Sequence, residues 1–153
     1  EVRAWYQQEN LAGLRDGLAL KADCHATLAQ LKARRLYLSI VSNIDDDMLE
    51  PIVAREGLQQ YFDHWTSSQT AQSCKPHRGI FELCLKKSGL AAHEVLFVGD
   101  SPEHDIDGAA WVGMKTALIL NAGAVPPLQS GRARTTPDYV IHSLTDLLGL
   151  VPA

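Results

Sequence analysis

The fold is decided by one segment, Val95-Leu96-Phe97-Val98-Gly99-Asp100-Ser101-Pro102-Glu103-His104-Asp105. A short apolar run ends at a glycine, and two carboxylates five residues apart follow it. The apolar run predicts a buried strand, and acidic residues just after such a strand lie where α/β sheets bind ligands. Two hard oxygen ligands at that place favour Mg²⁺ bound together with a phosphate group.

Length and composition indicate an ordinary globular protein. The 153 residues are enough for one domain with a hydrophobic core, and 46% of them are apolar while 21% are charged. The net charge of −4 argues against a nucleic-acid partner, and no apolar run is long enough to cross a membrane. Three cysteines without metal-type spacing predict reduced thiols and a cytoplasmic protein. Because the first residue is Glu1 and not Met, we expect the chain to begin inside a longer protein.

Strand and helix patterns alternate along the chain. Strands are predicted at 36–41, 64–67, 95–98, 116–120 and 139–141, and helices at 1–18, 23–33, 45–55, 76–87, 105–112 and 143–148. Pro51 lies inside the helical pattern 45–55 and predicts a kink or a short first turn there. A loop rich in Pro and Gly is expected at 121–137. The alternation predicts an α/β fold with a mostly parallel sheet and helices on both faces.

Polar residues at three places are expected to meet at one edge of this sheet. Ser42-Asn43 follows the first strand, Lys75 precedes the helix at 76–87, and Asp100 and Asp105 follow the third strand. The carboxyl ends of parallel strands share one edge, so a hydroxyl, an ammonium and two carboxylates converge there. This set suits phosphoryl transfer, because the hydroxyl and the ammonium neutralise phosphate oxygens while the carboxylates hold Mg²⁺.

The order of these motifs resembles the haloacid dehalogenase-like (HAD) hydrolase superfamily. The order is Ser42-Asn43, then Lys75-Pro76, then Gly99-Asp100 with Asp105, and the resemblance runs from about Leu28 to the C-terminus. The connecting segments resemble the family at 57–63, 80–82, 98–101, 105–109, 112–114 and 138–144. The resemblance implies a HAD-like Rossmannoid fold of three α/β/α layers. Residues 1–18 would be the remnant of a helical cap, and 19–153 would be the core.

The resemblance also implies a role for each residue of the constellation. Ser42 would hydrogen-bond the transferring phosphoryl group, Asn43 would neighbour the substrate, and Lys75 would be tied to the phosphate and the nucleophile. Asp100 would be a Mg²⁺ ligand, with Asp105 as second ligand or orienting acid. This pair of acids is similar to that of the Mg²⁺-dependent phosphatases. A phosphatase of small phosphorylated metabolites is therefore favoured over a 2-haloacid dehalogenase.

The nucleophile that the family implies is not found in the sequence. The resemblance implies a strand that ends in Asp-x-Asp ahead of Ser42, with a covalent nucleophile and a general acid/base. No residue before 36 fits, Asp105-Ile106-Asp107 has no strand running into it, and Asp45-Asp46-Asp47 is typical of a helix N-terminus. We therefore expect the central strand to be missing, the chain alone to be inactive, and another chain or segment to supply that strand.

Other interpretations remain open at this stage. A non-catalytic HAD-like binding or regulatory protein is one alternative, and a native N-terminus near Glu1 would favour it. A phosphoacceptor receiver domain gathers the same residue types but in the opposite order, with the acids first and the lysine last. Each site residue also has an ordinary explanation: Ser42 as a strand end, Lys75 as a surface lysine and Asp105 as a helix N-cap. His104 is expected to be a solvated loop residue, and Cys74 has no general base beside it.

Overall fold

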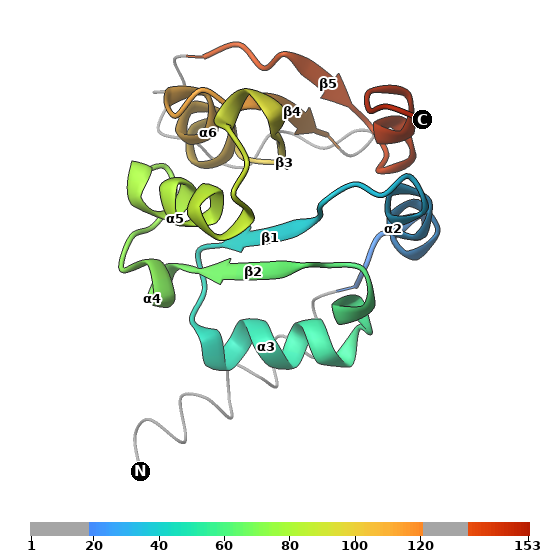
Figure 1. Cartoon of the computed structure of the whole chain (residues 1–153), viewed down its shortest axis with the longest axis horizontal. Coiled ribbons are helices and arrows are strands. Elements are labelled where there is room, and N and C mark those ends of the chain that lie inside the picture. Colours follow the sequence, from blue (N-terminus) through green and yellow to red (C-terminus); the bar gives the residue numbers. More distant parts are fainter. Residues whose placement is uncertain (1–18, 121–134) are drawn as a thin grey trace.

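A computed structural model describes residues 19–120 and 135–153 of the chain (Figure 1). Its strands are β1 (Ser39–Ser42), β2 (His64–Ser67), β3 (Leu96–Gly99), β4 (Lys115–Ile119) and β5 (Tyr139–Ile141). Its α-helices are α2 (Cys24–Ala33), α3 (Asp46–Arg55), α4 (Ser68–Ala71), α5 (Arg78–Ser88) and α6 (Gly108–Trp111). A π-helical turn covers Pro102–Asp107, and 3₁₀ turns cover Leu58–Gln60, Ala92–Glu94 and Thr145–Gly149. All five predicted strands are present, and none of the described helices is long and apolar enough to cross a membrane.

The strands form two parallel sheets. β1 pairs with β2 in a register that sets Ser39 opposite His64 and Ser42 opposite Ser67. β4 lies between β3 and β5 and pairs in parallel with both. Within the described ranges no strand pairing joins β1 to β3, although Figure 1 shows β1 on the side of its sheet that faces the other sheet. The parallel arrangement is confirmed, and the described strands form two sheets with no pairing between β1 and β3. The sequence predicts a missing strand at the centre of the sheet, and this stays a prediction.

Helices cover both faces of the divided sheet. Ile40 and Val41 are successive residues of β1, so their side chains point to opposite faces. Val41 packs against the cluster under α5 and α6, which contains Phe81 and Phe97. Ile40 packs against the cluster under α2 and α3, while Leu31 of α2 belongs to a third cluster with residues of β4, β5 and the C-terminal turn. The result is the expected three-layer α/β/α arrangement.

Side-chain packing joins the two sheets where backbone pairing does not. Phe81 of α5 is fully buried, and its ring meets that of Phe97 in β3 edge-on with centroids 5.1 Å apart. Val41 of β1 packs against the same cluster. A side chain at Gly108 of α6 would run into the Phe81 ring and the backbone of Pro76, so the glycine lets α6 approach α5 closely. The α5–α6 layer therefore spans the division.

The structure modifies two of the predicted helices, and it does not describe a third. α3 continues through Pro51, so the expected short first turn does not form. The predicted helix at 143–148 is a 3₁₀ turn, although the Ser143 hydroxyl still accepts the N–H of Asp146 at 3.3 Å. The predicted helix 1–18 and residues 121–134 of the predicted loop lie outside the described residues.

Candidate functional site

The predicted site residues occupy the carboxyl ends of β1 and β3. Ser42 is the last residue of β1, and Asn43 follows it. Lys75 lies in the connection between α4 and α5, and Asp100 directly follows β3. Asp105 lies in the π-helical turn that comes next. The topology therefore brings residues from three separate stretches of sequence to one edge, as predicted.

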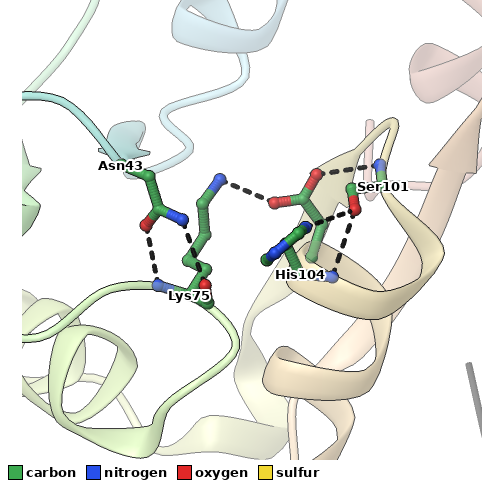
Figure 2. A network of polar contacts seen from close by, with 5 residues as sticks. Asn43, Lys75, Ser101 and His104 are labelled. Atoms are coloured by element: carbon green, nitrogen blue, oxygen red, sulfur yellow. Dashed lines mark hydrogen bonds and ion pairs between the residues drawn. The ribbon is translucent and has the colours of Figure 1, made fainter. Parts of the chain in front are cut away.

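Lys75 and Asp105 form a buried ion pair at this edge (Figure 2). The Lys75 Nζ donates to Asp105 Oδ1 at 2.6 Å, and the two side chains are only 14% and 5% exposed. The same ammonium lies 5.7 Å from the centroid of the Phe97 ring. Charges removed from water in this way interact far more strongly than a surface pair. The pair links the α5 side of the site to the turn after β3.

The turn after β3 is built to direct Asp105 back toward the strand. The carbonyl of Ser101 accepts the N–H groups of Asp105 at 2.9 Å and Ile106 at 3.2 Å, and the second bond is the longer spacing of a π turn. Asp105 Oδ2 in turn accepts the N–H of Ser101 at 3.0 Å. A side chain at Gly99 would overlap the Asp105 side chain, so only glycine leaves room for this carboxylate. The predicted helix at 105–112 thus begins earlier, at Pro102, and starts as a π turn.

The Asn43 side chain holds the backbone of Lys75. Asn43 Oδ1 accepts the Lys75 N–H at 2.7 Å, and Asn43 Nδ2 donates to the Lys75 carbonyl at 3.0 Å. Figure 2 shows both bonds beside the Lys75 side chain. The residue that follows β1 is thereby fixed to the residues that lead into α5. Motif spacing could not predict this contact. It joins a side chain to the backbone of a residue 32 positions away, and the path of that backbone is not evident from the sequence.

Asp100 and Ser42 are at the same edge without such partners. Asp100 is exposed, and within residues 19–120 and 135–153 its carboxylate makes no hydrogen bond or ion pair. Ser42 is half-buried, and its hydroxyl has no hydrogen-bond partner in that part of the chain. Among the residues that the structure describes, the site thus contains one carboxylate with partners, that of Asp105, and one without, that of Asp100.

The acids that imitate a nucleophile motif have other roles. Asp46 accepts the Thr70 hydroxyl at 2.7 Å, and its N–H donates to Gln69 Oε1 at 3.0 Å. Hydrogen bonds from the side chains of Ser67 and Thr70 hold the pKa of Asp46 below its ordinary value. These contacts tie the start of α3 to α4, as expected for a helix N-terminus. Asp107 is fully buried and accepts the Thr135 N–H at 2.8 Å.

His104 and Cys74 lie close to the site in sequence. His104 is exposed, as predicted, but its Nδ1 lies 3.0 Å from the Ser101 hydroxyl, which also accepts the His104 N–H at 3.1 Å. Cys74 is an exposed free thiol. No group of three His, Cys, Asp or Glu side chains suited to a metal ion occurs among the described residues.

Comparison with known proteins identifies the family. A sequence model of the haloacid dehalogenase-like hydrolases matches residues 2–119. The chain belongs to this family. Among solved structures, a HAD phosphatase from Thermococcus onnurineus superposes with a TM-score of 0.79 at 27% identity, covering 95% of this chain and 63% of that one. A dehalogenase superposes with a TM-score of 0.80 at 26% identity, covering 94% and 61%.

Curated relatives within the HAD family carry two kinds of name. The glyceraldehyde 3-phosphate phosphatase of Methanocaldococcus jannaschii is 33% identical over 126 residues, covering 82% of this chain and 53% of that protein. The (S)-2-haloacid dehalogenase of Pseudomonas sp. strain YL is 34% identical over 124 residues, covering 81% and 51%. The chain therefore spans about half the length of these relatives. The HAD resemblance and the HAD-like fold predicted from the sequence are confirmed.

Proposed function

We propose that this chain is the core of a HAD-family phosphatase that acts on small phosphorylated metabolites with Mg²⁺. The observation that carries the proposal is the buried Lys75–Asp105 pair at the carboxyl ends of β1 and β3. It stands at the same edge as the Ser42 hydroxyl and the exposed carboxylate of Asp100. The relative named as a phosphatase of a small phosphorylated sugar supports the same reading.

Each of these side chains has a task that its chemistry allows. The Ser42 hydroxyl donates a hydrogen bond to an oxygen of the phosphoryl group, and the Lys75 ammonium neutralises the charge on a second oxygen. Asp105 fixes that ammonium at the edge of the sheet, because the ion pair and the bond from Ser101 leave its carboxylate little freedom. The arrangement is preorganised, which is the main source of electrostatic stabilisation in phosphoryl transfer.

The side chains at this edge offer the type of donor atom, carboxylate oxygen, that suits Mg²⁺. Asp100 would hold the ion through its available carboxylate, and carboxylate oxygens are the ligands that Mg²⁺ prefers. Both oxygens of Asp105 are already engaged, which favours an orienting role for this residue. When bound, Mg²⁺ would supply positive charge beside the phosphate. Further ligands would come from the substrate, from water or from protein beyond the described residues.

We also propose that this chain alone lacks the nucleophile. β1 and β3 each have one strand neighbour in the described part of the chain, and the division between the sheets lies between them. A parallel strand that ends in Asp-x-Asp and fills this division would end beside Ser42 and Lys75. Another chain, or a segment of the same protein, would supply it.

Metal binding tests the first part of the proposal. Trp111 lies in α6, shortly after the turn at Pro102–Asp107. In a titration of the wild type with Mg²⁺, the change in Trp111 fluorescence should reach saturation. Asp100→Asn should weaken binding about tenfold or more, because it removes a charged ligand. Glu82→Gln removes an exposed carboxylate of α5 and is the matched control, which should bind as the wild type does. An unchanged response in Asp100→Asn would contradict the metal site.

Hydrolysis tests the second part. The chain with Mg²⁺ should not turn over a panel of small phosphate monoesters. A synthetic peptide with four apolar residues followed by Asp-x-Asp should restore turnover, whereas the same peptide with Asn-x-Asn should not. Robust turnover by the chain alone would show that the nucleophile lies within the 153 residues.

The two other functions make different predictions in the same assays. A 2-haloacid dehalogenase, which the Pseudomonas relative favours, would release chloride from 2-chloropropionate without Mg²⁺ once the strand is supplied. The exposed carboxylate of Asp100 argues against it, because a metal-independent reaction has no need of this group. A non-catalytic binding protein would bind Mg²⁺ and phosphate but show no turnover with any added strand.

A further inference from the structure

We propose that Asn43 is a positioning residue that acts on the site through the backbone of Lys75. The sequence resemblance placed Asn43 beside the substrate, and the geometry points to a different use of its amide. Asn43 would place the Lys75 side chain whether or not the site binds phosphate. Only the test that measures phosphate binding rests on the proposed function. No contact between Asn43 and a substrate is required.

The amide of Asn43 matches the backbone of a single residue. Its Oδ1 accepts the Lys75 N–H at 2.7 Å, and its Nδ2 donates to the Lys75 carbonyl at 3.0 Å. An asparagine side chain carries a donor and an acceptor side by side, so it pairs with one residue as a neighbouring strand would. Two bonds to one residue fix both its position and its orientation. The Asn43 amide then keeps one N–H and one lone pair for any other partner.

Lys75 is therefore held at both ends. Asn43 fixes its backbone from the end of β1, and Asp105 Oδ1 accepts its ammonium at 2.6 Å from the turn after β3 (Figure 2). The side chain between these two points is only 14% exposed. A flexible four-carbon stem loses rotamer freedom when its head is placed, and a fixed backbone lowers that cost. The loss of the Asn43 bonds should therefore loosen the ammonium without removing any charge from the site.

The side-chain amide of Gln69 makes a hydrogen bond to the backbone nearby and provides a matched control. Gln69 Oε1 accepts the Asp46 N–H at 3.0 Å, so it joins α4 to the start of α3. Among the described residues, the Gln69 side chain makes no hydrogen bond to Lys75. Gln69→Ala should therefore remove an amide–backbone bond at the same edge and leave Lys75 in place.

Chemical labelling tests the positioning role without any ligand. Acetylation of each lysine by N-hydroxysuccinimide acetate is followed by peptide mass spectrometry, with exposed Lys86 as internal reference. Asn43→Ala should raise the rate at Lys75 about tenfold, the equivalent of two lost hydrogen bonds. Asn43→Asp should raise it as well, because it sets a second oxygen against the Lys75 carbonyl. The Lys86 rate should stay constant, and Gln69→Ala should behave as the wild type does.

Phosphate binding then separates action through Lys75 from direct contact. Calorimetric titration of inorganic phosphate with Mg²⁺ should show about tenfold weaker binding in Asn43→Ala. Asn43→Ala should have no further effect in a Lys75→Met background, because the residue then has no ammonium to position. An additive loss in the double variant would mean that Asn43 touches the phosphate, which would overturn the proposal.

The two measurements also keep this inference apart from the proposed function. If the wild type binds no phosphate but Asn43→Ala still exposes Lys75 to acetylation, the positioning role stands and the phosphatase proposal fails. If phosphate binds and acetylation of Lys75 is the same in Asn43→Ala and the wild type, the positioning role is wrong. Lys75→Met leaves the buried Asp105 carboxylate unpaired, so its fold is checked by circular dichroism. The labelling result does not depend on that variant.

Discussion

β1 and β4 are both apolar parallel strands, yet the molecule buries them to different extents. β4 has a neighbour on each side, and its residues Thr116–Ile119 are all buried. β1 pairs with β2 alone in the described part of the chain, and all four of its residues are half-buried. Parallel sheets normally cover both faces and both edges of their inner strands, and an uncovered edge exposes unpaired backbone groups.

The difference indicates that β1 has the composition of an inner strand in the surroundings of an edge strand. Ile40 and Val41 pack against clusters on opposite faces, so both faces of β1 are covered by helices. Within residues 19–120 and 135–153, what β1 lacks is a strand neighbour along the hydrogen-bonding direction toward β3. The comparison therefore supports the proposal that a further strand belongs there, and the following substitutions test how much each half depends on its neighbours.

The largest effect is expected from Phe81→Ala. Phe81 is fully buried in the cluster that joins Val41 of β1 to Phe97 of β3. Its truncation should lower the free energy of unfolding by about 3–5 kcal/mol, through lost apolar burial and the cavity left behind. Urea denaturation followed by circular dichroism measures this change. Because Phe81 links the two sheets, two separate transitions would show that the halves unfold independently, and a loss below about 1 kcal/mol would contradict the packing role.

A matched pair of isoleucines tests the comparison directly. Ile119 in β4 is buried, whereas Ile40 in β1 is half-buried. Ile119→Ala should cost about 2–5 kcal/mol of unfolding free energy, and Ile40→Ala roughly half as much, because less apolar surface leaves water there. Both values come from the same denaturation assay. Equal losses of unfolding free energy would mean that the greater exposure of β1 does not lower the contribution of Ile40 to stability. If the Asp-x-Asp peptide fills the division between the sheets, the loss caused by Ile40→Ala should be larger when the peptide is present.

Gly99→Ala should have an intermediate effect that is concentrated at the site. The added Cβ would overlap the Asp105 side chain, so the turn after β3 has to move. A loss of about 1–3 kcal/mol in unfolding free energy is expected, together with faster acetylation of Lys75. Gly149→Ala is the control, because nothing lies within 4 Å of a Cβ at that position. Normal labelling of Lys75 in Gly99→Ala would show that Asp105 tolerates the extra group.

The smallest effect concerns the pH dependence of the β1–β2 half. Burial and the charge on Lys87 hold the pKa of His64 below its ordinary value, with Asp63 opposing them. The ring lies between the Tyr37 hydroxyl, 2.7 Å from Nδ1, and the Cys84 thiol, 3.7 Å from Nε2. The unfolded chain binds a proton on this histidine more readily than the folded chain does. Its contribution to stability is therefore present above about pH 6.5 and is lost as the pH falls below that value.

Denaturation at pH 7.5 and pH 5.5 measures this contribution. The wild type should lose stability on going to the lower pH, and His64→Gln should lose less, since a glutamine at position 64 does not titrate. Asp46 and Asp63 have lowered pKa values and respond only near and below about pH 4, outside this window. An equal loss in the variant would assign the pH dependence to other groups.

Local patterns in the sequence predicted the strands and the edge where the site residues meet. Apolar runs that end at Ser42 and Gly99 placed the two strand ends, because strand length and turn chemistry are local properties. Gly57 and Gly89 end their helices in the left-handed conformation, as glycine after a helical pattern predicts. The fold class could be predicted because the alternation of strands and helices is also read from local patterns. The order of the motifs added the family.

Contacts between distant segments could not be predicted in this way. The Asn43 bonds to Lys75 and the ring of His64 between Tyr37 and Cys84 join residues far apart in the chain. The π turn at Pro102–Asp107 depends on where the Asp105 carboxylate fits, and this in turn depends on the space left by Gly99. Alternation of strands and helices alone does not specify which strands pair, and only the family resemblance led us to expect a missing central strand where the sheet divides.

The space at Gly99 also sets a rule for grafting this loop onto other sheets. The Asp105 carboxylate occupies the volume that a side chain at position 99 would fill, so the two positions form one unit that cannot be exchanged separately. A designer who transplants the turn at 100–107 without its preceding glycine would move the acid away from the lysine it pairs with. Positions 99 and 105 should likewise covary among related sequences.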